Sequence, residues 1–217
     1  MTESEAIQAR HSVRQYKAKA IEGDIAKQIE DKVAEVNAES GLHFQFLNDS
    51  GTAYTNLFLK ITGLNSAPAS IACVGKDSAD LEEKVGYYGE KLVLFLQTLG
   101  LNTCWVGSFN KKRSEAEIGE GERNVISIAV GYGENEGKAH KSKSEDQLVE
   151  ASGDRPEWFN EGVKAALLAP TALNQQKFVI RLKDDDSAEI VSKGGAFTSV
   201  DLGIVKYHFE VGSGRKL

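Results

Sequence analysis

The sequence has few cysteines and no excess of positive charge. Two cysteines, Cys73 and Cys104, among 217 residues cannot make a disulfide framework or a four-cysteine zinc site, so a cytoplasmic location is expected. Lysine and arginine total 26 against 32 for aspartate and glutamate, a formal net charge of −6. Such a chain has no overall positive field for nucleic acid or an anionic membrane, and neither is expected as a partner. An anionic ligand would need a local cluster of basic side chains.

Long apolar runs are also missing. Residues 92–96 form an apolar run of five, whereas a membrane-spanning helix needs roughly 20. The first residues, MTESE, are acidic and lack the basic start and apolar stretch of a signal peptide. Apolar residues make up 41% and charged residues 27% of the chain, which is typical of an ordinary soluble globular protein.

Signatures of common nucleotide and metal sites are absent from the sequence. No Gly-x-x-x-x-Gly-Lys-Ser/Thr loop occurs, and residues 131–137 (GYGENEG) miss the dinucleotide fingerprint by one residue and lead into a polar stretch. We interpret them as a turn. No metal site is expected, because the histidines are far apart and have no carboxylate at metal-binding spacing. They are His11, His43, His140 and His208.

Hydrophobic periodicity predicts helices and strands mixed in both halves of the chain. The predicted helices cover residues 2–16, 23–38, 55–62, 80–99, 156–169 and 199–211. The predicted strands cover residues 43–47, 69–74, 125–130, 177–182 and 188–191. The helix at 80–99 has the strongest signal, and residues 99–107 are expected to form a turn at its end. The pattern indicates an α+β or α/β fold with one sheet shared by two lobes.

A change of composition divides the chain. Residues 134–144 have almost no apolar content and cannot supply core. We therefore interpret residues 134–156 as a basic arm or linker between a first lobe, residues 1–133, and a second lobe, residues 157–217.

Two basic clusters stand out in this acidic chain. In the first, Arg10 and Arg14 lie four residues apart on one face of the predicted helix, with Ser12 between them. Arginine offers a planar fork of donors that suits a phosphate. The second cluster is Lys141 and Lys143 in the arm, with a serine between them. If the arm folds over the first helix, the two clusters meet at one dianion. Each cluster alone is more commonly a solvated basic face.

Two further segments could line a flat ligand. Residues 99–107 are apolar and punctuated by glycine, and their backbone amides and indole could lie along an aromatic ring; alternatively Cys104 and Trp105 fill core. Residues 169–176 place three side-chain amides and a hydroxyl in a helix-to-strand connection. They could bind the polar edge of a heterocycle or act only as local capping groups.

At these residues the sequence resembles the FMN-dependent nitroreductase-like flavoproteins. Residues 10–14 (RHSVR) match their Arg-x-Ser-x-Arg phosphate motif, and 101–107 (LNTCWVG) are similar to their Gly-Leu-Gly-Thr-Cys-Trp-Ile-Gly stretch. Residues 128–132 with 141–143 resemble their late strand and basic arm, and 169–176 (APTALNQQ) resemble their Ala-Pro-Ser-x-x-Asn-x-Gln segment. The resemblance implies an α+β, nitroreductase-like fold with a central mixed sheet flanked by helices.

The order of the motifs departs from the usual family pattern. In the family's homodimers the Ala-Pro-Ser segment follows soon after the arginine motif and reaches the flavin from the other subunit. Here no such segment stands at residues 40–46, and the match lies far downstream, at 169–176. The resemblance therefore implies a fused branch, in which one chain with two lobes imitates the homodimer and binds one FMN. Such a chain is expected to be a monomer (a pseudo-dimer) rather than an obligate homodimer.

The resemblance also implies function and site residues. It implies an FMN-dependent NAD(P)H oxidoreductase that passes a hydride from NAD(P)H through the flavin to a nitroaromatic, quinone or similar flat acceptor, in a ping-pong cycle without a catalytic side chain. The phosphate would be held by Arg10, Ser12, Arg14, Lys141 and Lys143. The remaining flavin contacts would be His11, Thr103, Cys104, Trp105, Val106, Gly107, Pro170, Thr171, Ala172 and Asn174.

Three alternatives stay open at this point. The chain could bind or store flavin without turnover, which a test of NAD(P)H oxidation would reveal. It could use reduced FMN itself as a substrate. A structural domain without cofactor would require both basic clusters to be accidental.

Overall fold

The computed structural model describes residues 1–48, 53–54, 59, 63–64 and 67–217. The helix predicted at 55–62 lies outside the described residues, Leu59 apart. The chain packs as two compact units, and each is named here by its sheet. The four-stranded unit comprises Arg10–Leu81 and Leu92–Lys138, and the three-stranded unit comprises Met1–Ala9, Glu82–Lys91 and Ala139–Leu217. The chain therefore passes between units within the predicted arm, and the lobes proposed from composition stay a prediction.

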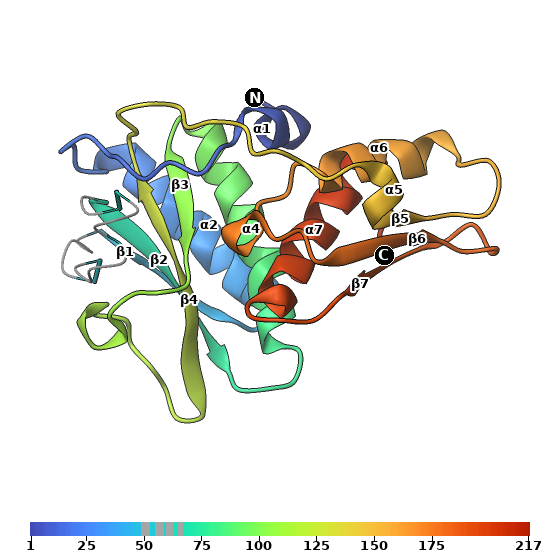
Figure 1. Cartoon of the computed structure of the whole chain (residues 1–217). Coiled ribbons are helices and arrows are strands. Elements are labelled where there is room, and N and C mark those ends of the chain that lie inside the picture. The colour runs from blue at the N-terminus through green and yellow to red at the C-terminus, as the bar shows by residue number, and fades with distance from the viewer. Residues whose placement is uncertain (49–52, 55–58, 60–62, 65–66) are drawn as a thin grey trace. The chain divides into compact units, whose positions relative to one another are not determined.

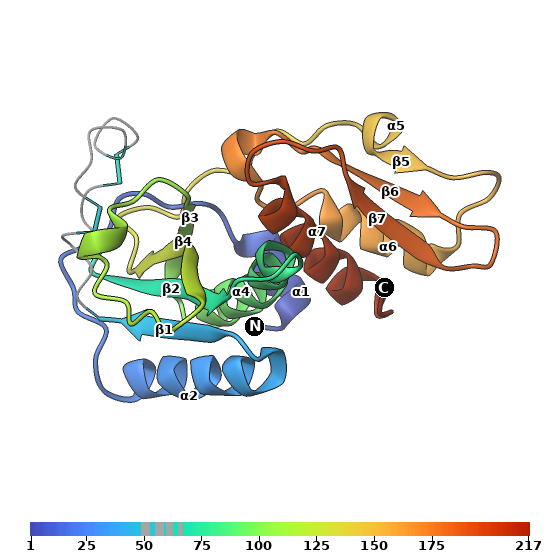
Figure 2. The ribbon, with the colours of Figure 1, turned by 90° about the horizontal axis from the view of Figure 1, so that it is seen from below.

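The four-stranded unit is built on an antiparallel sheet (Figure 1). In spatial order its strands are β1 (His43–Leu47), β2 (Ala69–Lys76), β4 (Glu122–Gly131) and β3 (Asn102–Val106). Helix α2 (Gly23–Ser40) runs along one face beside β1 (Figure 2) and buries Ile29, Val33 and Val36 there. It ends at Gly41, whose φ of 71° is a left-handed conformation that glycine adopts without strain. A 3-10 turn, η1 (Lys111–Arg113), precedes β4.

The three-stranded unit has a smaller, mixed sheet. Strand β5 (Val149–Glu150) pairs parallel with β6 (Phe178–Leu182), and β6 pairs antiparallel with β7 (Ala188–Ser192). The helices of this unit are α1 (Glu3–Ala9), α5 (Glu145–Leu148), α6 (Glu157–Ala166), α7 (Thr198–Ser213) and the first half of α4 (Leu81–Thr98).

Glycines allow close helix contacts in the three-stranded unit. A Cβ atom on Gly203 of α7 would collide with the carbonyl oxygen of Glu83 in α4, and one on Gly86 would collide with the carbonyl oxygen of Val200. A Cβ atom on Gly162 of α6 would lie 2.6 Å from the ring of Phe209. The helices therefore approach more closely than side chains with a Cβ atom would permit.

The core of the three-stranded unit contains an aromatic cluster and a buried polar pair. Phe159 and Phe209 are fully buried, and Trp158 packs edge-to-face against both rings. The guanidinium of Arg215 lies over the Trp158 indole, 4.1 Å from the ring centre. The buried polar pair is His208 with Glu90, and both side chains are 0% exposed.

The α+β class and most predicted elements are confirmed. Helix α4 matches the predicted helix at 80–99, with Gly100 (φ 75°) two residues after its last residue, Thr98. The single central mixed sheet is wrong, because the described strands form two sheets. The turn predicted at 99–107 is wrong as well, since residues 102–106 are strand β3. Among the described residues, no helix is long and apolar enough to cross a membrane.

The first predicted helix is too long. Helix α1 ends at Ala9, and the chain then continues as an irregular segment that pairs Ser12 with Thr103 in parallel and Tyr16 with Gly133. Strand β3 would otherwise present unpaired backbone groups along this edge, and the segment covers part of it. Arg10 and Arg14 are therefore not on one helix face.

Candidate functional site

The first half of the candidate site lies in the four-stranded unit, where the arginine motif runs beside β3. Ser12 pairs with Thr103, and the Val13 N–H donates to the Thr103 carbonyl at 3.0 Å. Val13 is 1% exposed and packs with Tyr16 and Cys104 in the core. The structure thus brings together two of the predicted segments, residues 10–14 and 103–107, by backbone pairing rather than on a helix.

Strand β3 turns alternate side chains to opposite faces. Cys104 and Val106 pack into the core of the unit, and they are 5% and 3% exposed. Trp105, between them, is half-buried on the other face. Of the side chains predicted to line a ring, Cys104 and Val106 are therefore core residues, whereas Thr103 and Trp105 lie on the opposite face of the strand.

The charges of Arg10 and Arg14 both affect the Cys104 thiol. Arg10 is only 4% exposed, whereas Arg14 is exposed. Burial raises the pKa of the Cys104 thiol, and the nearby charges of Arg14 and Arg10 oppose that rise. The raised pKa disfavours the thiolate, which is the nucleophilic form of a cysteine.

The predicted arm begins beside this motif. The Glu134 N–H donates to the Gln15 carbonyl at 2.9 Å. Gly137 has a φ of 73°, and a Cβ atom there would lie 2.8 Å from His11 Cβ and 3.1 Å from the Ser12 carbonyl oxygen. Only a residue without a side chain passes here without displacing the motif. The Nδ1 atom of His11 is buried and has no hydrogen-bond partner among the described residues, so it can still bond a ligand.

Sequence reasoning missed Asn102, which organises the same turn. Its side chain is 5% exposed; Oδ1 accepts the Gly133 N–H at 2.9 Å and Nδ2 donates to Glu136 at 3.1 Å. The available signal was a polar residue inside an apolar stretch, because a buried amide needs partners.

The second half of the candidate site lies in the three-stranded unit, where the later part of the arm binds the 170–176 loop. The Lys143 ammonium donates to the carbonyl of Gln175 at 2.7 Å and to that of Gln176 at 3.1 Å. The Lys141 carbonyl accepts from Nδ2 of Asn174 and Nε2 of Gln176, both at 3.0 Å. The structure thus brings Lys141 and Lys143 against Asn174, Gln175 and Gln176. The other predicted loop residues, Pro170, Thr171 and Ala172, stand at the start of the same loop.

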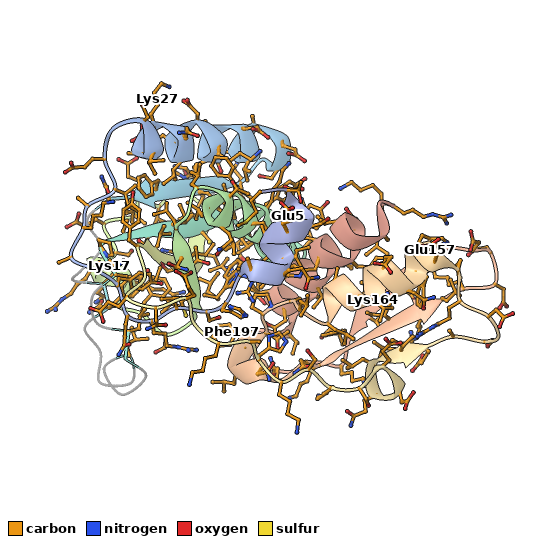
Figure 3. The ribbon with its side chains drawn as sticks, turned by 90° about the horizontal axis from the view of Figure 1, so that it is seen from above. Glu5, Lys17, Lys27, Glu157, Lys164 and Phe197 are labelled. Carbon is orange, nitrogen blue, oxygen red and sulfur yellow. The ribbon has the colours of Figure 1, made fainter. Side chains whose placement is uncertain are left out.

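Several non-glycine residues of this loop have positive φ angles. Leu173 and Asn174, in the 3-10 turn η2 (Ala172–Asn174), have φ values of 51° and 54°, and Gln176 has 46°. Leu173 is 93% exposed. Phe197, labelled in Figure 3, precedes α7 in the same unit with a φ of 62°. Non-glycine residues in this region cost free energy and cluster at functional sites.

Each half of the candidate site is therefore assembled within one unit. Residues 10–14 with 103–107 form one half, and Lys141, Lys143 and residues 170–174 form the other. That both halves bind one ligand stays a prediction. Among the described residues, no group of three or more His, Cys, Asp or Glu side chains could hold a metal ion.

The fold is shared with solved nitroreductase-family structures. A "putative nitroreductase" from Thermotoga maritima is 24% identical, with a TM-score of 0.69 over 97% of this chain and 83% of its own. A nitroreductase family protein from Streptococcus pneumoniae is 16% identical, with a TM-score of 0.55 over 67% and 98%. A "putative NADH dehydrogenase/NAD(P)H nitroreductase" from Bacteroides thetaiotaomicron is also 16% identical, with a TM-score of 0.52 over 67% and 95%.

Residues 3–213 match the model of the family described as "Putative TM nitroreductase". The chain belongs to this nitroreductase family, as its motifs predicted. No curated protein matches the chain.

Proposed function

We propose that the protein is an FMN-dependent NAD(P)H oxidoreductase of the nitroreductase type, acting on a nitroaromatic, quinone or similar flat acceptor. The observation that carries the proposal is the pairing of Ser12 with Thr103, which sets the arginine motif against β3 in a chain that belongs to a nitroreductase family. The Bacteroides relative, whose name includes NAD(P)H nitroreductase, supports a nicotinamide as the electron donor.

The residues of the first half fit the phosphate end of FMN. Arg10, Ser12 and Arg14 offer two guanidiniums and a hydroxyl, and these donors suit a dianionic phosphate. The unpartnered Nδ1 atom of His11 adds a hydrogen-bonding position beside them. Trp105 and the backbone of residues 103–107 would lie along the ring system.

The second half would contribute donors as well. Lys141 is exposed, and two of the three ammonium hydrogens of Lys143 already serve the carbonyls of Gln175 and Gln176, so Lys143 keeps one for phosphate. Thr171 Oγ1 accepts the Gln176 N–H at 3.1 Å and keeps its own hydrogen to donate. One amide hydrogen of Asn174 is likewise left after its bond to Lys141. We propose that these residues, with Pro170 and Ala172, complete the flavin site.

Bound FMN would supply the electron-transfer chemistry, and the chain would bind and orient it. The fused arrangement, in which one chain takes the place of the family's homodimer, implies one FMN per chain and a monomer.

The test is reconstitution followed by reduction. The purified protein is incubated with FMN and desalted in low salt, and flavin is counted per chain. We expect about one FMN per chain, bleaching of its visible absorption by NADH or NADPH under anaerobic conditions, and recovery on adding a quinone. No retained flavin would contradict the proposal, and a ratio clearly above one would contradict the fused site. Bound flavin that NAD(P)H fails to bleach would indicate a flavin carrier.

A further inference from the structure

A buried carboxylate anchors the 170–176 loop from beneath. Asp201, in the first turn of α7, is 6% exposed. Its Oδ1 accepts the backbone N–H of Ala172 at 2.9 Å, and its Oδ2 accepts from Nε2 of Gln175 at 2.8 Å. The same Nε2 donates to the carbonyl of Ala196 at 3.0 Å. One side chain therefore fixes both ends of the turn η2 and, through Gln175, the segment before α7.

The turn needs such an anchor because its backbone is strained. Leu173 and Asn174 lie between the two groups that Asp201 binds, and both have positive φ values, 51° and 54°. Leucine in this conformation persists only where the surroundings impose it. Leu173 itself is 93% exposed and gains little packing, so hydrogen bonds must hold the turn. Those that Asp201 accepts from Ala172 and Gln175 act together with the bonds from the arm to Asn174 and Gln175.

We infer that Asp201 is a positioning residue, which preforms the Thr171–Asn174 turn for FMN through its bonds to Ala172 and Gln175. The inference rests on the proposed flavin site, and it extends that site to a side chain that does not touch the cofactor. None of the sequence motifs contains Asp201.

The cost of burying the Asp201 carboxylate distinguishes a role in positioning the turn from a role in stabilising the folded protein. Burial raises the pKa of the Asp201 carboxyl, and the hydrogen bonds from Ala172 and Gln175 oppose the rise. Burial therefore disfavours the ionised form that the two donors require. A neutral isostere removes this burial penalty but cannot accept from both donors, so loop geometry and global stability should respond differently.

The decisive variant is Asp201→Asn. The new amide can still accept from Ala172 but presents N–H groups to Gln175, so the turn loses one of the two hydrogen bonds that Asp201 makes with it. We expect FMN to bind about tenfold more weakly, and the amide hydrogens of residues 172–176 to exchange faster in the flavin-free protein. The thermal midpoint of the flavin-free protein should not fall, and kcat at saturating FMN should stay within about twofold of the wild-type value.

Two further variants complete the test. Gln175→Ala breaks the same link from the other side and should weaken FMN binding in the same direction. Asp184→Asn makes the same charge change at an exposed position in the β6–β7 turn and should leave FMN affinity unchanged.

The outcomes separate the inference from the proposed function. Wild-type affinity in both Asp201→Asn and Gln175→Ala, or equal weakening in Asp184→Asn, would overturn the positioning role while FMN binding stands. Failure of the wild-type protein to bind FMN would instead overturn the proposed function, and the inference with it.

Discussion

His208 and Glu90 form a polar pair in the core of the three-stranded unit. Nε2 of His208 lies 2.9 Å from Oε1 of Glu90, and both side chains are 0% exposed. Nδ1 of the same ring contacts the Ala165 carbonyl at 3.1 Å, a contact that requires hydrogen on Nδ1 because a carbonyl oxygen only accepts. The pair links α4 to α7, and the ring links α7 to α6, at a depth where an unmatched polar group is costly.

We expect Glu90→Ala to lower the free energy of unfolding by about 3–5 kcal/mol, since it leaves the buried imidazole without its partner. Urea denaturation followed by circular dichroism measures this loss. The matched control is Glu161→Ala on α6, where the ion pair with Lys164 is exposed; it should change stability by less than about 1 kcal/mol. Similar losses in the two variants would contradict a structural role for the pair.

Gly203→Ala tests the close contact of α4 with α7. The added methyl group would meet the Glu83 carbonyl oxygen, so we expect a loss of about 1–3 kcal/mol or more in the free energy of unfolding. Ser199→Ala adds no atom at an exposed position of the same helix and serves as the control. A Gly203→Ala protein as stable as the control would show that the helices can separate without cost.

Arg14→Ala tests the phosphate site. The loss of a charged donor should cost about 1.5–3 kcal/mol of binding free energy, or roughly 10- to 150-fold in the FMN dissociation constant, measured by fluorescence titration. Lys27, which Figure 3 labels on α2, pairs with Asp31, and Lys27→Ala removes the same charge from the same unit. Unchanged affinity in Arg14→Ala, or the same loss in Lys27→Ala, would remove Arg14 from the site.

The pH dependence of the free energy of unfolding should reveal the raised pKa of the buried Asp201 carboxyl. Its pKa is raised by burial, so the folded protein holds the proton more tightly than the unfolded chain. The stabilisation from this proton is complete below the unfolded pKa of about 3.9 and is lost as pH rises through the higher folded pKa. The wild-type protein should therefore lose stability relative to Asp201→Asn as pH rises across that interval.

Urea denaturation of both proteins at a series of pH values measures this difference, and effects of other carboxyl groups cancel between them. A difference that does not vary with pH would show that Asp201 titrates alike in the folded and unfolded states.

Local patterns predicted most helices and strands but not the long-range pairing. The leucines of α4 and the glycine after it are visible in the sequence, and the predicted helix is confirmed. Val13 and Tyr16 also have helical spacing, yet they are buried because residues 10–16 pair with Thr103 and Gly133. The spacing of residues within one segment cannot predict which distant segment it will pair with.

The sequence predicted the motifs of the candidate site but not the residues that hold those motifs in place. The arginine motif, the β3 segment, the arm and the 170–176 loop all stand out as residue types suited to a ligand. Asp201 does not, since an acidic residue in the first turn of a helix is common for dipole reasons alone. Its role depends on the fold of a loop that is distant in sequence, as does that of Asn102.

The two tryptophans fall in different units: Trp105 on β3 and Trp158 beside Phe159 and Arg215. Replacing either one with phenylalanine leaves a single indole that emits from a known unit. Fluorescence can then report whether the units melt together or one after the other. Energy transfer from Trp105 to an added flavin would give an optical signal that needs no catalytic turnover.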